Sequence, residues 1–270
     1  MVPVTRDFQS DTPLPAKTLA YLSEIFGRDW PSPEKLHHRS RQVAIHLESA
    51  KESVAHFLAI EPAELEIIGG TSTALSLGIS GLLTDNATHF YFGATDRRTS
   101  GAAATLFEKR GGKSTRLESD VTGQITYSNI SASSAATAWQ SVNRETGVIQ
   151  QSSPESGSLC ADMTCDPFAQ LPARWDTAIW EPASWGGPRG IGLLAINKSS
   201  KSWRNPGAQI ADYRSAPDFS VPLFIAAALS LEEAFTTRDD AKIAENHHHF
   251  VTVLKARDRK STRLNSSHLG

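Results

Sequence analysis

In the stretch Trp180-Glu-Pro-Ala-Ser184-Trp-Gly-Gly-Pro-Arg-Gly-Ile-Gly192-Leu-Leu-Ala-Ile196, a glycine-rich turn joins two predicted strands. The flanking segments 175–180 and 191–196 have the apolar, β-branched and aromatic content that is typical of buried strands. The four glycines between them allow the backbone to turn tightly. The stretch therefore predicts a strand, a turn that carries Ser184, and a second strand.

Outward from this turn, predicted strands alternate with amphipathic helices. Alternation of this kind is typical of an α/β fold with a mainly parallel sheet that is covered by helices on both faces. The predicted strands are 65–68, 89–92, 114–117, 137–142, 158–161, 177–180 and 191–196, and the predicted helices are 16–26, 39–58, 71–83, 101–109 and 241–254.

Composition narrows the class of protein. With 270 residues and 39% hydrophobic content, the chain is long enough for one large α/β domain and part of a second. The formal net charge of -2, with no basic cluster in the body of the chain, argues against a nucleic-acid surface. The longest apolar run, 221–231, is too short to cross a membrane, and the N-terminus has no apolar signal core. We therefore expect a cytoplasmic globular protein with a small-molecule partner.

Two groups of residues have the composition of weak metal sites. Cys160 and Cys165 form one pair without a second, which favours buried, reduced thiols. The run His247-His-His249 points three rings in directions about 100° apart on a helix, so they cannot converge on one ion and indicate a solvated face. We predict no metal site.

The C-terminal segment is unusual. Residues 258–268, Asp-Arg-Lys-Ser-Thr-Arg-Leu-Asn-Ser-Ser-His, match a translated sequencing adapter, although a basic, Ser-rich disordered tail is the alternative. We therefore expect a large domain at 1–235, the beginning of a truncated C-terminal domain at 236–257, and a non-native tail at 258–270.

Two places in the sequence have residues suited to ligand chemistry. The run Gly69-Gly-Thr71-Ser72-Thr73 comes where a predicted strand passes into a helix, so its N–H and hydroxyl groups can bind a phosphate, or Thr71 or Ser72 can simply cap the helix. Asp162 follows a predicted strand, where its carboxylate can bind a protonated ring nitrogen or cap a loop. Both interpretations stay open at this point.

Six short motifs in order resemble the class V aminotransferase fold, the pyridoxal phosphate (PLP)-dependent family that includes cysteine desulfurases. They are 7–13 (D-x-x-A-T-T-P in the family), 32–39 (N-P…H-R), 69–73 (S-G-A-T-E), 142–147 (N-N-E-x-G), 159–162 (V-D-A) and 187–192 (G-P-K-G-I-G). The resemblance implies a PLP-transferase large domain with a seven-stranded type of sheet. It also implies that Thr71 and Ser72 bind the cofactor phosphate and that Asp162 binds the pyridine nitrogen.

The chain departs from the family pattern at the chemically active positions. Ser184 stands where the family has the lysine that forms an imine with PLP, and a serine hydroxyl can neither form that imine nor act as a base near neutral pH. Arg97 stands at the histidine that stacks on the ring, Arg144 at the asparagine near the PLP hydroxyl, and Cys165 at the glutamine after the Asp. Lys198 and Lys201 are the nearest other amines in the sequence.

The resemblance and the departures lead to two expectations. One is a PLP-dependent enzyme of the desulfurase or aminotransferase type that acts on a small amino acid, impaired by Ser184, in an intact protein that forms a homodimer. The alternative is a non-catalytic homologue that binds PLP or a related phosphate, or serves as a dimer partner or scaffold. An unrelated phosphate-binding α/β protein is a third possibility.

Overall fold

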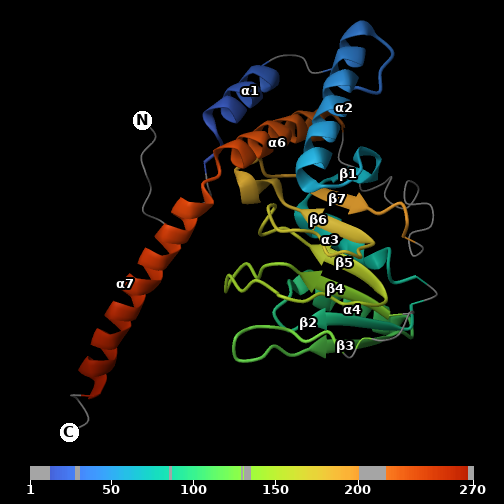
Figure 1. The fold of residues 1–270 in the computed structure, drawn as a ribbon. Helices are drawn as coiled ribbons and strands as arrows, with labels where there is room; N and C mark the ends of the chain where they lie inside the picture. Colours follow the sequence, from blue (N-terminus) through green and yellow to red (C-terminus); the bar gives the residue numbers. More distant parts are fainter. Residues whose placement is uncertain are drawn as a thin grey trace. The chain divides into compact units, whose positions relative to one another are not determined.

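A mixed sheet of seven strands forms the centre of the computed structural model, which describes residues 13–27, 31–84, 87–128, 130, 135–200 and 217–266. The strands lie in the order β1-β7-β6-β5-β4-β2-β3, as Figure 1 shows. Strand β7 pairs antiparallel with both β1 and β6, and the other pairings are parallel. The predicted mainly parallel, seven-stranded α/β sheet is confirmed.

The strands begin and end close to the predicted positions. Two of them, β1 and β6, match the predicted ranges, whereas β4 begins two residues earlier and ends two residues earlier than predicted, and β5 includes Asp162 as its last residue. The strands are β1 Leu65–Ile68, β2 His89–Gly93, β3 Lys113–Leu117, β4 Ala135–Gln140, β5 Ser158–Asp162, β6 Thr177–Trp180 and β7 Gly192–Ile196.

The helices differ from the prediction mainly at their ends. The apolar run 221–231, for which no secondary structure was predicted, lies within a long helix, α6, that contains Pro222. The helices are α1 Ala16–Phe26, α2 His38–Leu58, η1 Pro62–Glu64, α3 Thr71–Ser80, α4 Arg98–Lys109, η2 Pro182–Trp185, α6 Pro217–Thr237 and α7 Asp240–Ser266. No helix of the described residues has the length and apolar content needed to cross a membrane.

Helices α3 and α4 cover one face of the sheet, because their apolar side chains share a core with alternate residues of the strands. This core includes Phe107 of α4, Cys160 of β5 and Ile179 of β6. Gly78 of α3 allows the closest approach, since a Cβ there would lie 2.8 Å from Ile179 Cδ1 and 3.3 Å from Cys160 Sγ. Asp162, two residues after Cys160, therefore faces the same side of the sheet as α3.

The turn that follows β6 packs on α6. Trp185 in η2 is buried, and its Nε1 donates to the carbonyl of Ala227 at 3.0 Å. A Cβ on Gly187 would lie 3.0 Å from Ser230 Oγ, so this glycine lets the turn approach the helix closely. These contacts hold the segment that carries Ser184 against a buried helix face.

The chain divides into two compact units, Met1–Glu233 and Ala234–Gly270. The first unit contains the sheet. In the second unit, His247, His248 and His249 lie exposed on α7, as predicted for a solvated helix face. Among the described residues, no group of three or more His, Cys, Asp or Glu side chains is placed to hold a metal ion.

A substitution at Gly192, the first residue of β7, tests the contact between the glycine turn and α3. A Cβ at Gly192 would lie 2.8 Å from the backbone C and O of Gly70 and from Cα of Thr71. We expect Gly192→Ala to lower the free energy of unfolding by about 1–3 kcal/mol, since backbone must shift to relieve the overlap. Urea denaturation measures this loss.

Gly101→Ala is the matched control for that substitution. A Cβ at Gly101, inside α4, would meet only Phe92 Cε2, at 4.0 Å. We expect this change to be neutral or to stabilise the chain by about 0.5–1 kcal/mol, because alanine favours helix more than glycine does. Equal stability of the two variants would contradict the close approach of β7 to α3.

Candidate functional site

The ends of β5 and β6 and the loop between β2 and α4 bring the candidate residues to one edge of the sheet. Asp162 ends β5, Glu181 follows β6, and the neighbouring register pairs Asp162 with Ile179. Arg97 immediately precedes α4, which follows the end of β2. Since the carboxyl ends of adjacent parallel strands meet at one edge, charged side chains from distant parts of the sequence converge there.

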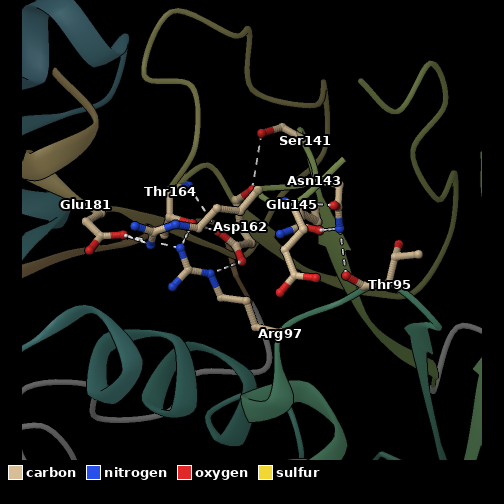
Figure 2. Close-up of polar contacts among 10 residues, drawn as sticks. Thr95, Arg97, Ser141, Asn143, Glu145, Asp162, Thr164 and Glu181 are labelled. Carbon is tan, nitrogen blue, oxygen red and sulfur yellow. Dashed lines mark hydrogen bonds and ion pairs between the residues drawn. The ribbon is translucent and has the colours of Figure 1, made fainter. Parts of the chain in front are cut away.

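The guanidinium of Arg97 is the centre of this cluster (Figure 2). Its Nε lies 3.4 Å from Asp162 Oδ2, and its Nη2 donates to Thr164 Oγ1 at 2.6 Å and to Glu181 Oε2 at 3.3 Å. The Arg97 side chain is only 19% exposed. Arg97 is therefore held at the sheet edge by two hydrogen bonds, to Thr164 and Glu181, and by an ion pair with Asp162.

Asp162 is buried, and both of its carboxylate oxygens have partners. Oδ1 accepts from the Thr164 backbone N at 3.0 Å and from Thr164 Oγ1 at 2.5 Å, and Oδ2 faces Arg97. Burial raises the pKa of Asp162, whereas the Arg97 charge and the hydrogen bonds from Thr164 oppose that rise. The sequence left open whether Asp162 caps a loop or binds a cation. In the structure its carboxylate does both, since it caps the loop at Thr164 N and pairs with Arg97.

Glu181 joins the two arginines. Its Oε2 accepts from Arg97 Nη2 at 3.3 Å and from Arg144 Nη1 at 3.1 Å. Arg144 is 56% exposed, so its pair with Glu181 contributes little to stability. Sequence reasoning missed Glu181. Like Asp162, it comes directly after a predicted strand, and the same signal could have found it.

Asn143, also missed from the sequence, organises the loop that carries Arg144. Its Nδ2 donates to the Thr95 carbonyl at 2.8 Å, and its Oδ1 accepts from the backbone N atoms of Glu145 at 3.0 Å and Thr146 at 2.8 Å. Figure 2 shows Asn143 between Thr95 and Glu145. This residue ties the loop after β4 to the loop before Arg97.

Ser184 lies in η2, and its side chain is turned toward its own backbone. Its Oγ donates to the Glu181 carbonyl at 2.8 Å, and its N donates to the same carbonyl at 2.9 Å. The hydroxyl thus closes a short turn three residues after Glu181. No atom of this serine can supply the imine-forming amine.

Lys198 lies too far along the sheet to replace that amine. In the register of β6 with β7, Trp180 faces Leu193 and Thr177 faces Ile196, so Lys198 lies beyond the opposite end of β6. Five residues at about 3.3 Å each separate Lys198 from Leu193 by roughly 16 Å. Its backbone N donates to Glu64 Oε1 at that far edge, at 2.9 Å. Lys201 lies outside the described residues.

The N-terminus of α3, where the sequence predicted a phosphate site or a side-chain cap, has no side-chain cap. Gly70 is the N-cap, with φ 135°, and no side chain caps the helix, so the alternative in which Thr71 or Ser72 caps it does not hold. The first N–H groups of a helix have no partner within it, and the helix dipole favours an anion there. Thr71 is half-buried and Ser72 exposed, which leaves both next to these N–H groups.

Neither cysteine is activated as a nucleophile. Burial raises the pKa of the Cys160 thiol, which points toward α3, and burial also raises the pKa of the half-buried Cys165 thiol. A thiol with a raised pKa holds little thiolate near neutral pH. The prediction of a buried thiol is confirmed for Cys160, whereas Cys165 is only half-buried.

A second buried carboxyl lies beside the cluster. Asp96 Oδ2 accepts from Gly93 N at 2.8 Å, while Asp96 Oδ1 and the Tyr127 hydroxyl are buried without a hydrogen-bond partner among the described residues. Burial, helped by the nearby charge of Asp162 and opposed by the hydrogen bond from Gly93, raises the pKa of Asp96 to about 7. Sequence reasoning missed this group, because nothing in the pattern marks the loop after β2 as buried.

Comparison with known proteins identifies the fold. A NifS-like protein superposes with a TM-score of 0.72 at 17% identity, over 84% of this chain and 68% of that one. The fold is that of the cysteine desulfurases. SspA, solved in complex with cysteine, gives a TM-score of 0.68 at 18% identity, over 82% of this chain and 70% of that one.

A further solved structure has the same fold, whereas the two sequence comparisons find no match. A cysteine desulfurase from Thermococcus onnurineus NA1 gives a TM-score of 0.69 at 15% identity, over 84% of this chain and 66% of that one. No protein-family model and no curated protein sequence matches the chain. The predicted PLP-transferase type of fold is confirmed, and the chain spans about two thirds of the length of these structures.

Proposed function

We propose that the chain is a non-catalytic relative of the desulfurases that binds a small phosphorylated ligand, PLP or a close analogue, without covalent attachment. The observation that carries this proposal is the ion-paired group at the sheet edge, in which Arg97 lies 3.4 Å from Asp162 and 3.3 Å from Glu181. That group fills the ring end of the site, and Ser184 offers no amine there.

The residues fit one end of PLP and not the other. The uncapped N-terminus of α3, with Thr71 and Ser72 beside it, suits a phosphate dianion. At the opposite end Ser184 offers no amine to the aldehyde, and the Asp162 carboxylate already faces a guanidinium. Binding of the phosphate thus survives in this proposal, whereas the chemistry that lysine supplies does not.

A titration with PLP tests this proposal directly. Purified protein is titrated with PLP, the visible spectrum is recorded, and the sample is reduced with borohydride and mapped by mass spectrometry. We expect saturable binding that inorganic phosphate competes away, with no reduced adduct on any lysine. An adduct would instead support an impaired PLP enzyme acting on a small amino acid, and absence of binding would overturn both functions.

Restoring the missing amine gives a sharper prediction. Because Ser184 occupies the position of the imine-forming lysine and is only half-buried, we expect Ser184→Lys to form a PLP imine that borohydride traps at residue 184. The unmodified chain should show the free aldehyde spectrum under the same conditions. Mass spectrometry of the reduced peptide measures the adduct.

Ser184→Met is the matched control for the restored lysine. It has a side chain of comparable length and no amine, so it should bind PLP reversibly and give no adduct. A failure of Ser184→Lys to react, in a variant that keeps the stability of the unmodified chain and still binds PLP, would show that residue 184 does not face the ligand. The expected homodimer stays a prediction, which light scattering can check.

A further inference from the structure

Arg97 occupies the place in which a ligand cation would meet Asp162. Its Nε lies 3.4 Å from Asp162 Oδ2, while Asp162 Oδ1 is taken by the backbone N and the hydroxyl of Thr164. Asp162 is 6% exposed. Oδ1 is occupied by two hydrogen bonds and Oδ2 already faces the Arg97 guanidinium, so a ligand cation at this carboxylate would compete with Arg97.

The charges of the four ion-paired side chains balance one another without a ligand. The carboxylates of Asp162 and Glu181 face the guanidinium groups of Arg97 and Arg144, two negative charges against two positive ones. Adding a pyridinium would place a third cation beside this group and would require Arg97 to leave its carboxylates. Like charges brought together in a partly buried site repel strongly.

Several contacts oppose such a displacement. Arg97 Nη2 donates to Thr164 Oγ1 at 2.6 Å and to Glu181 Oε2 at 3.3 Å, so moving the guanidinium breaks both hydrogen bonds as well as the ion pair. Its backbone is also fixed, because Arg97 is the N-cap residue of α4 and its carbonyl accepts from Ser100 N at 2.9 Å. The guanidinium is thus a fixed part of the site rather than a mobile side chain.

We propose that Arg97 determines ligand specificity by serving as the resident cation on Asp162, so that the site accepts phosphorylated ligands whose far end is neutral or anionic, including PLP with an unprotonated ring nitrogen. This proposal rests on the phosphate binding proposed above. In this arrangement a ring nitrogen contributes nothing to affinity, because Asp162 is not available to protonate and bind it. The exposed guanidinium of Arg144 extends the preference toward ligands that carry a carboxylate or a second anion.

Two esters that differ only in the ring nitrogen test the proposal. Benzyl phosphate and the pyridylmethyl phosphate with its nitrogen in the PLP position are titrated calorimetrically into the unmodified protein, Arg97→Gln and Arg97→Lys. We expect equal affinities in the unmodified protein. In Arg97→Gln the freed carboxylate should favour the pyridyl ester roughly tenfold or more, since hydrogen bonds between charged groups are the stronger kind.

Arg97→Lys is the matched control, because it keeps a cation beside Asp162 and should keep the two affinities equal. Asp162→Asn provides a variant in which the carboxylate is removed while Arg97 remains, and it should also leave the ratio of affinities at one. A tenfold preference for the pyridyl ester in the unmodified protein, or equal affinities for the two esters in Arg97→Gln, would overturn the role of Arg97. Binding of neither ester would overturn the proposed function and this inference together.

Discussion

Removal of the Arg97 charge is expected to destabilise the chain by about 3 kcal/mol. Arg97→Met leaves the buried Asp162 carboxylate without its cation, and breaking a buried pair in this way typically costs about 3–5 kcal/mol. The lower end of this range applies because the Arg97 side chain is still 19% exposed. Urea denaturation measures the loss in the free energy of unfolding. The dependence of that free energy on urea concentration should be the same in both proteins.

The double variant Arg97→Met, Asp162→Asn separates charge from packing. Asparagine keeps an oxygen that can accept from Thr164 N, at 3.0 Å in the native chain, and removes the unpaired charge. We expect the double variant to recover most of the stability, because replacing both members of a buried pair is often close to neutral. Equal losses in the single and double variants would show that Arg97 acts through packing alone.

The second large effect concerns Asp96 and pH. Burial raises the pKa of Asp96 to about 7, from an unfolded value of 3.8. Between these values the folded chain binds a proton that the unfolded chain releases, so this carboxyl makes the chain less stable as pH rises and the effect is complete above the folded pKa. From about pH 5 to pH 8 the loss should be about 2–3 kcal/mol, at about 1.4 kcal/mol per pKa unit.

Asp96→Asn should remove that dependence. The amide oxygen can keep the hydrogen bond from Gly93 N, which is 2.8 Å long in the native chain, and no charge forms at high pH. Relative to the unmodified protein, the variant should therefore gain stability steadily as pH rises through the window. The difference between the two denaturation curves, measured at each pH, isolates this group from the histidines. A difference that stays constant with pH would contradict a raised pKa at Asp96.

The fold was predictable to a large extent because burial leaves a local pattern. Strands β1 and β6 match their predicted ranges, since each is a short apolar segment bounded by a turn or loop. Helix α6 was missed because it is apolar over most of its length and contains Pro222, so it shows no amphipathic period. The shifted ends of β4 have the same cause, since all six of its residues are buried and no alternation marks its limits.

The sequence predicted individual residues of the candidate site but not the contacts between them. Asp162, Arg97 and Arg144 were selected through their positions in the family motifs, and the structure brings all three into one charged cluster with Glu181. Ser184, also selected, lies within η2, and its hydroxyl donates to the Glu181 carbonyl. Glu181, Asn143 and Asp96 were not selected, because their roles depend on partners that are distant in the sequence or on burial.

The sequence by itself determined the α/β class, the strand end at which Asp162 lies, and the absence of an amine at residue 184. These features depend on local periodicity, on strand ends and on the identity of single residues. Only the tertiary structure decided that Arg97 neutralises Asp162, because Arg97 precedes α4 and Asp162 ends β5, 65 positions apart in the sequence. An ion pair depends on a distance of a few ångströms across the sheet edge, and spacing along the chain does not contain that distance.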